Sequence, residues 1–215
     1  MLVMPSNNSG IEIGYLAGRH EGRIGWLISP GGWRRPPSWL SYSLDNGAFT
    51  AWKNNKQWDE GAFMDLIERT RGHQRPLWIA VPDVVADSEA TKALWPEWSQ
   101  RIRTAAPHVP LAFVVQDGMS EADVPQGAEV IFVGGSTDWK WSTLGIWTKA
   151  FPRVHVGRVN TERRLWQCHE HGVESCDGTG WMRGDQEQIE GLRRYLRLST
   201  RNDKPMQMVM EAITE

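Results

Sequence analysis

The feature of this sequence that most constrains its fold is an alternation of short apolar runs with longer amphipathic stretches. About seven apolar runs are predicted strands: residues 23–29, 39–44, 76–82, 111–115, 129–133, 153–159 and 173–176. The amphipathic stretches between them are predicted helices: residues 59–71, 87–103, 139–150, 162–171 and 186–198. Strands that alternate with helices through short links form a parallel sheet.

Nearly every predicted strand ends in polar residues or glycine, and three end in an aspartate: Asp45, Asp83 and Asp177. In a closed barrel the carboxyl ends of all strands converge on one mouth, where such enzymes place their chemistry. An open doubly wound sheet is the alternative architecture. A chain of 215 residues is close to the lower limit of about 200 for a barrel. We therefore predict a compact α/β fold, an imperfect (β/α)8 TIM-like barrel.

The two ends of the chain carry weaker signals. Residues 1–23 hold several glycines among polar residues and show no clear period, so they are assigned only as an N-terminal segment. Residues 199–215 are polar and then Met-rich, which fits either a last helix over 205–213 or a mobile tail. Both are assigned to a single domain spanning residues 1–215.

Composition narrows the setting in which the protein works. The net charge of −2 provides no global basic field, so any nucleic-acid contact has to come from a local patch. With 2 cysteines, no apolar run of membrane-spanning length and no signal-peptide pattern, we expect a soluble cytoplasmic protein with no membrane partner. Most of the 13 tryptophans are expected in the core, although some could stack on bases.

The ordered strand ends carry a resemblance to a known family. They read Asp45-Asn46-Gly47-Ala48-Phe49, Pro82-Asp83, Gln116-Asp117-Gly118, Gly134-Gly135-Ser136, Val156-Gly157-Arg158 and Cys176-Asp177-Gly178. This order resembles the tRNA-guanine transglycosylase superfamily over roughly residues 24–197. The small size is most similar to the DNA 7-deazaguanine transglycosylases (DpdA), which are common on phage genomes. The resemblance implies an enzyme of a bacterial or phage-infected cytoplasm that replaces guanine in DNA with a preQ0-type base.

The resemblance also implies a role for each strand-end residue. Asp177 corresponds to the nucleophile and Asp45 to an acid that contacts the base and relays protons. The implied substrate-binding residues are Phe49, Asp83, Gln116, Gly134, Gly135, Val156 and Gly157, with Phe49 stacking on the base. Two departures are that Asp117 separates Gln116 from Gly118 and that the family's zinc-binding cysteine motif is absent.

The same residue types suit base exchange on chemical grounds alone. Exchange at C1′ passes through an oxocarbenium-like centre that a carboxylate can stabilise or bond to, and the departing guanine needs a proton from a second acid. Asp177 and Asp45 meet these demands, while Asp83 offers a carboxylate to the N–H edge of the base. Each aspartate could instead be a turn former beside glycine. The alternatives are the same reaction on tRNA, an N-glycosidase, and a non-catalytic binder of nucleobases or nucleic acid.

Two further groups of residues are candidates for binding. Trp33, Arg34, Arg35, Arg158 and Arg183 are predicted to contact DNA, because arginine forks grip phosphates and tryptophan stacks on bases. Cys168, His171 and Cys176 could form a structural zinc site, but their spacing matches no standard motif. We expect no required cofactor, with DNA, a 7-deazaguanine base and accessory proteins as partners.

Overall fold

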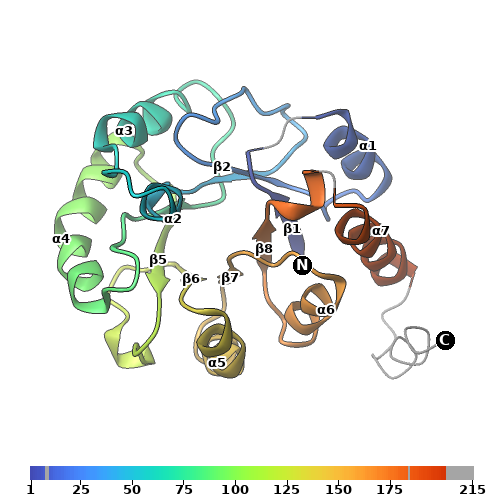
Figure 1. Ribbon diagram of the computed structural model, residues 1–215. Helices are drawn as coiled ribbons and strands as arrows, with labels where there is room; N and C mark the ends of the chain where they lie inside the picture. Colours follow the sequence, from blue (N-terminus) through green and yellow to red (C-terminus); the bar gives the residue numbers. More distant parts are fainter. Residues whose placement is uncertain (8–9, 184, 202–215) are drawn as a thin grey trace.

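The protein folds into an eight-stranded parallel sheet, as seen in a computed structural model that describes residues 1–7, 10–183 and 185–201 (Figure 1). The strands are β1 (Leu2–Pro5), β2 (Trp26–Ile28), β3 (Tyr42–Leu44), β4 (Ile79–Ala80), β5 (Leu111–Val115), β6 (Val130–Val133), β7 (Val154–Val156) and β8 (Ser175–Gly178). Their order in the sheet is β1-β8-β7-β6-β5-β4-β3-β2, so β2 to β8 follow the order of the sequence and β1 lies beside β8. This arrangement confirms the predicted parallel sheet.

The two ends of this sheet meet and close it into a barrel. β1 is bridged to the chain around β2, with Val3 opposite Ile24 and Ser6 opposite Leu27. The backbone N–H of Gly25 donates to the carbonyl oxygen of Val3 at 2.9 Å. The fold is therefore the predicted TIM-like barrel and not the open doubly wound sheet.

The N-terminal segment holds more structure than its sequence indicates. Within residues 1–23, for which no element is predicted, the chain forms β1 and a helix over Ile11–Arg19. The apolar run of β1 is only a few residues long, and glycines interrupt the helix, so neither element shows a readable period. The first strand of the barrel was thus missed, which is why about seven strands are predicted where the described residues contain eight.

The described residues contain seven α-helices, all of which lie around the sheet except α2, which lies inside the ring of the others (Figure 1): α1 (Ile11–Arg19), α2 (Ala48–Lys53), α3 (Glu60–Glu68), α4 (Ser88–Ala105), α5 (Thr137–Ala150), α6 (Glu162–Glu170) and α7 (Gln186–Arg201). Short 3₁₀ turns are η1 (Glu121–Asp123) and η2 (Gly180–Met182). The carboxylates of Asp59 and Asp87 cap α3 and α4 by accepting backbone N–H bonds at 2.9 Å. The proposed helix over 205–213 lies outside the described residues.

The barrel is imperfect because two of its described crossovers contain no α-helix. Residues 29–41 join β2 to β3 as an extended loop, and only η1 interrupts the connection from β5 to β6. In the first gap Trp33 takes the place of a helix, packing its ring 6.5 Å from that of Tyr42 and 5.9 Å from that of His73. A half-buried tryptophan thus covers the outer face of β3.

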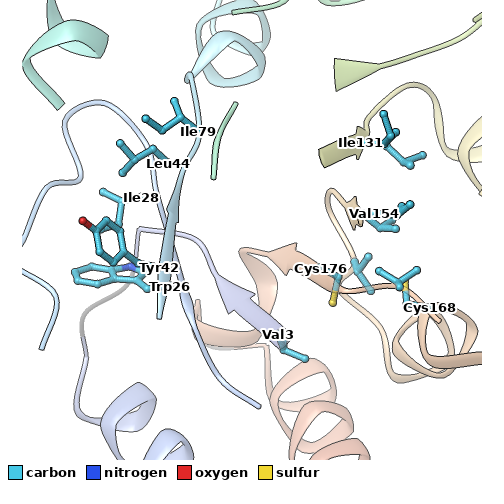
Figure 2. Close-up of a cluster of buried hydrophobic side chains, with 14 of the residues drawn as sticks. Val3, Trp26, Ile28, Tyr42, Leu44, Ile79, Ile131, Val154, Cys168 and Cys176 are labelled. Atoms are coloured by element: carbon cyan, nitrogen blue, oxygen red, sulfur yellow. The ribbon is translucent and has the colours of Figure 1, made fainter. Parts of the chain in front are cut away.

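Alternate residues of each strand face opposite sides of the barrel wall, which creates two packed layers. The outward layer, much of it drawn in Figure 2, packs against the helices and includes Val3, Trp26, Ile28, Tyr42, Leu44, Ile79, Ile131, Val154 and Cys176. The inward layer is smaller and consists of Met4, Leu27, Trp78, Ala80, Ala112 and Val130, with Phe132 packed against it. Trp78 is fully buried. The interior of the barrel is therefore filled with side chains. None of the helices in the described ranges is both long and apolar enough to cross a membrane.

Candidate active site

Three carboxylates from distant parts of the chain meet at the carboxyl ends of the strands. Asp45 follows β3, Asp83 follows β4, and Asp177 lies within β8. They are close enough that the charges of Asp177 and Asp83 both raise the pKa of Asp45. The structure thus brings together the three aspartates that the strand-end pattern singles out.

Asp45 is held in a setting that favours its protonated form. Its Oδ2 accepts hydrogen bonds from the Ser29 hydroxyl at 2.9 Å and the Gly47 backbone N–H at 3.2 Å. Burial and the nearby Asp177 charge outweigh these bonds and raise the pKa of Asp45 to about 7. Asp45 can therefore donate or accept a proton near neutral pH.

Asp83 is tied to the loop that follows β3. Asn46 donates its side-chain amide to Asp83 Oδ1 and to the carbonyl oxygen of Val81, each at 2.9 Å. Burial raises the pKa of Asp83 to about 6, although the Asn46 hydrogen bond and the positive charge of Arg158 oppose that rise. Asn46, which sequence reasoning left without a role, thus fixes Asp83 relative to Asp45.

Asp177 receives hydrogen bonds from three donors. Its Oδ1 lies 3.2 Å from both His155 Nε2 and the backbone nitrogen of Arg158. Its Oδ2 accepts a bond from the Ser6 hydroxyl at 3.1 Å. Oδ1 is therefore held by two groups and Oδ2 by one, so Oδ2 retains more capacity to interact with a ligand. Ser6 belongs to the N-terminal segment, for which the sequence predicts no function.

His155 is another residue that sequence reasoning missed. Its imidazole is fully buried, with ring centres 4.7 Å from Trp78 and 4.6 Å from Phe132. Nδ1 lies 2.8 Å from the Ser175 hydroxyl. An ionised Asp177 can only accept, so Nε2 carries the proton and Nδ1 accepts from Ser175. The strand alternation offered a signal, because His155, Ser175 and Asp177 all face inward.

A hydrogen-bonded series links Ser175, His155 and Asp177, but it is not arranged for a serine to act as a nucleophile. Ser175 is 1% exposed and lies beneath His155, on the side away from the mouth. A nucleophilic serine has to reach its substrate. Asp177, which is 6% exposed, is the member of this hydrogen-bonded series nearest the mouth, so Ser175 and His155 serve to orient its carboxylate.

Arg158 and two glycines form the wall beside Asp177. Arg158 has a left-handed backbone, with φ 60°, and its guanidinium lies 4.4 Å from the ring centre of Phe49 while donating to the carbonyl oxygen of Gly135. A Cβ at Gly157 would lie 2.7 Å from Phe132 Cε1, and one at Gly135 would lie 2.7 Å from Asp117 Oδ2. Phe49, Gly135, Gly157 and Arg158 thus lie where the sequence predicts, around the carboxylates.

A buried lysine lies behind this wall. Lys140 on α5 is 2% exposed and donates its ammonium to the carbonyl oxygen of Gly157. Burial and the nearby Arg158 charge lower its pKa to about 8, and Asp177 partly opposes that fall. Nothing in the sequence distinguishes Lys140 from the solvated lysines of a helix.

Some residues predicted to contact the substrate have other roles in the structure. The Gln116 side chain is buried and bonds to the backbone of Val84, Ala86 and Asp87 and to the Thr91 hydroxyl, so it orders the loop after β4. Val156 faces outward into the core beneath the helices. Gly134 packs tightly, because its Cβ would lie 3.2 Å from Val114 Cγ1. The Gln116 side chain thus makes its hydrogen bonds within the protein, and the Val156 side chain points away from the mouth.

The predicted nucleic-acid residues separate into two groups. Trp33 packs its ring against Tyr42 and His73 on the outside of the barrel, and it also lines a hollow with Asn7 and Pro30, which follow β1 and β2. The sequence cannot reveal this, because the missing helix between β2 and β3 is what admits the ring. Arg34 and Arg35 are exposed in the same loop, and Arg183 is exposed just after η2, on the side of the mouth.

The candidate zinc ligands do not converge. Cys168 on α6 and Cys176 on β8 are buried free thiols that interact with each other in the outer core (Figure 2). His171 instead lies against α5, where a Cβ at Gly145 would be 3.2 Å from its Cε1. Among the residues that the structure describes, no group of three or more His, Cys, Asp or Glu side chains is placed to hold a metal ion.

Fold and site together define a (β/α)8 barrel whose mouth carries three interacting carboxylates. A scan against protein-family models finds no matching family, and a search of curated proteins finds no match to the chain.

Proposed function

We propose that the protein is a base-exchange transglycosylase that replaces guanine in DNA with a 7-deazaguanine base of the preQ0 type. The observation that carries the proposal is the meeting of Asp45, Asp83 and Asp177 at one barrel mouth, with the pKa of Asp45 raised to about 7. Asp45, with a pKa near neutral pH, suits the role of an acid, and Asp177, whose carboxylate is held by hydrogen bonds, suits that of a nucleophile. The reaction needs both.

Asp177 is the proposed nucleophile. Its Oδ2 attacks C1′ of the deoxyribose while the C1′–N9 bond breaks, and the electron pair of that bond leaves with guanine. His155 and the Arg158 backbone N–H hold Oδ1, which fixes the plane of the carboxylate and leaves Oδ2 for the attack. Ser6 donates to Oδ2 and would stay bonded to the carboxyl group once the glycosyl bond has formed.

Asp45 is the proposed acid and base. It gives its proton to the departing guanine, which neutralises the charge that the leaving base acquires. When the incoming 7-deazaguanine attacks C1′ through its N9, Asp45 takes up the N9 proton and Asp177 is released. Asp45 thus returns to its starting protonation state, because it gives a proton in the first half-reaction and regains one in the second.

The base is proposed to lie between Asp83 and Phe49. A carboxylate with a pKa of about 6 is ionised at neutral pH and can accept from the N–H edge of guanine or its 7-deaza analogue. In the structure the Arg158 guanidinium covers Phe49. An entering base would stack on Phe49 in place of that guanidinium, or on the guanidinium itself. The Gly134-Gly135 turn, which borders the same wall, offers backbone groups to the base.

The test is release of radiolabelled guanine from a labelled oligodeoxynucleotide when preQ0 is added. We expect release by the wild-type protein and its loss in Asp177→Asn, which keeps the volume of the side chain. Asp65→Asn is the matched control, because Asp65 is exposed on α3, and it should release guanine at the wild-type rate.

Each other outcome points to a different function. Guanine release without incorporation of preQ0 would indicate an N-glycosidase, and exchange on tRNA alone would move the substrate from DNA to tRNA. Binding of DNA with no chemistry on any substrate would indicate a non-catalytic binder. Unchanged exchange in Asp177→Asn would refute the assignment of the nucleophile.

A further inference from the structure

An exposed segment at the mouth combines an aromatic ring with positive charge. Residues 52–57 (Trp-Lys-Asn-Asn-Lys-Gln) are all exposed, and Trp52 is 54% exposed at the end of α2. Figure 1 shows α2 inside the ring of outer helices, where it follows the carboxyl end of β3. The segment therefore lies on the same side of the barrel as the three aspartates.

Trp52 is connected to the site through a continuous series of contacts. Its ring centre lies 5.8 Å from that of Phe49, which the Arg158 guanidinium covers at 4.4 Å. The backbone of Arg158 donates in turn to Asp177. A planar group stacked on Trp52 would thus lie next to a base that contacts Phe49 and the carboxylates, on its solvent side.

The segment is electropositive beside a strongly acidic site. Residues 46–58 contain Lys53 and Lys56 and no acidic residue. The chain is fixed at its far end, where the indole N–H of Trp58 donates to the carbonyl oxygen of Asn46 at 2.8 Å. Residues 52–57, called the ledge below, carry a stacking ring, two ammonium groups and side-chain amides. These groups match a polyanion that carries planar bases, which is nucleic acid.

We propose that residues 52–57 bind the DNA strand next to the exchanged nucleotide, with a neighbouring base stacked on Trp52 and phosphates near Lys53 and Lys56. The inference rests on the proposed function for the identity of the bound strand. It moves the aromatic contact from Trp33, which the fold uses on the outer face of the barrel, to Trp52. It also predicts that a free deoxynucleoside, which has no neighbouring base, cannot use this ledge.

The test is binding of a fluorescein-labelled single-stranded oligodeoxynucleotide, followed by anisotropy, in Trp52→Ala and Trp52→Phe. Loss of one stacked base should weaken binding about 10-fold in Trp52→Ala, while Trp52→Phe retains most of the affinity. Trp39→Ala is the matched control, since Trp39 is 62% exposed but lies just before β3, at the opposite end of the barrel. Lys53→Gln combined with Lys56→Gln should reduce the slope of log Kd against log salt by about 1.4.

Guanine exchange is measured on the same variants, so that the two proposals can fail separately. Weaker binding in Trp52→Ala with no exchange by any variant would support the ledge and refute the transglycosylase. Wild-type exchange chemistry with unchanged affinity in Trp52→Ala would refute the ledge alone. Equal losses in Trp52→Ala and Trp39→Ala, or no oligodeoxynucleotide binding by the wild-type protein, would also overturn it.

Discussion

His155 Nε2 lies 3.2 Å from Asp177 Oδ1, and the imidazole is fully buried beneath the carboxylate. The Ser175 hydroxyl lies 2.8 Å from the other ring nitrogen, and the rings of Trp78 and Phe132 fix the plane of the imidazole. The orientation of Asp177 is thus determined from inside the barrel. Residues that never meet the substrate can therefore control its chemistry.

Replacing His155 tests this control. His155→Phe keeps a ring but removes the donor to Asp177, and we expect kcat/KM for guanine exchange to fall about 10- to 100-fold, as for loss of a hydrogen bond to a charged group. His155→Gln can place an amide N–H near the position of Nε2 and should recover part of that loss. A purely structural role would make both variants lose thermal stability while kcat stays at the wild-type value.

The pH profile of exchange follows from the two raised pKa values. Asp45, with a pKa of about 7, has to be protonated to act as the acid, so the rate should fall above about pH 7. Asp83, with a pKa of about 6, has to be ionised to hold the base, so binding should weaken below about pH 6. We expect a bell-shaped profile of kcat/KM whose limbs report the interacting carboxyl groups together. A rate that keeps rising to pH 9 would contradict the role of Asp45.

Asp45 should also lower stability at neutral and alkaline pH. An aspartate in the unfolded chain has a pKa of about 3.9, whereas folding raises that of Asp45 to about 7. Between these values the folded state binds more protons than the unfolded state, so the free energy of unfolding falls as pH rises. Asp45→Asn removes the charge, and at pH 8 we expect its Tm to be about 2–4 °C higher, which corresponds to about 1 kcal/mol. At pH 4 the two proteins should melt together, and a lower Tm for the variant at pH 8 would contradict the argument.

Trp33 should matter for stability and not for nucleic acid. Its ring fills the gap left by the missing helix between β2 and β3, so Trp33→Ala should lower the free energy of unfolding by about 2 kcal/mol. Urea unfolding followed by circular dichroism measures this loss. Oligodeoxynucleotide affinity of the folded variant should match the wild type. If Trp33→Ala kept wild-type stability but lost affinity for the oligodeoxynucleotide, Trp33 would instead contact nucleic acid at the mouth.

The carboxylates and the barrel could be predicted because their signals are local. An apolar run that ends in Asp45 or Asp177 beside glycine marks the end of a strand, and in a parallel barrel all such ends share one face. The signal for β1 is too short to read, and with it Ser6 was missed. His155 stands in an apolar run that reads as core, so its contact with Asp177 becomes visible only when β7 and β8 are paired in register.

The alternation of strands and helices and the positions at which polar groups end the strands could be read from the sequence, because both depend on neighbours along the chain. Which side chains at those ends face the mouth depends on how distant segments pack. The Gln116 side chain bonds to Thr91 and the loop after β4, and the Trp33 ring packs against Tyr42 on the outer wall of the barrel. Burial and mutual repulsion, which exist only once distant strands meet, gave Asp45 its raised pKa.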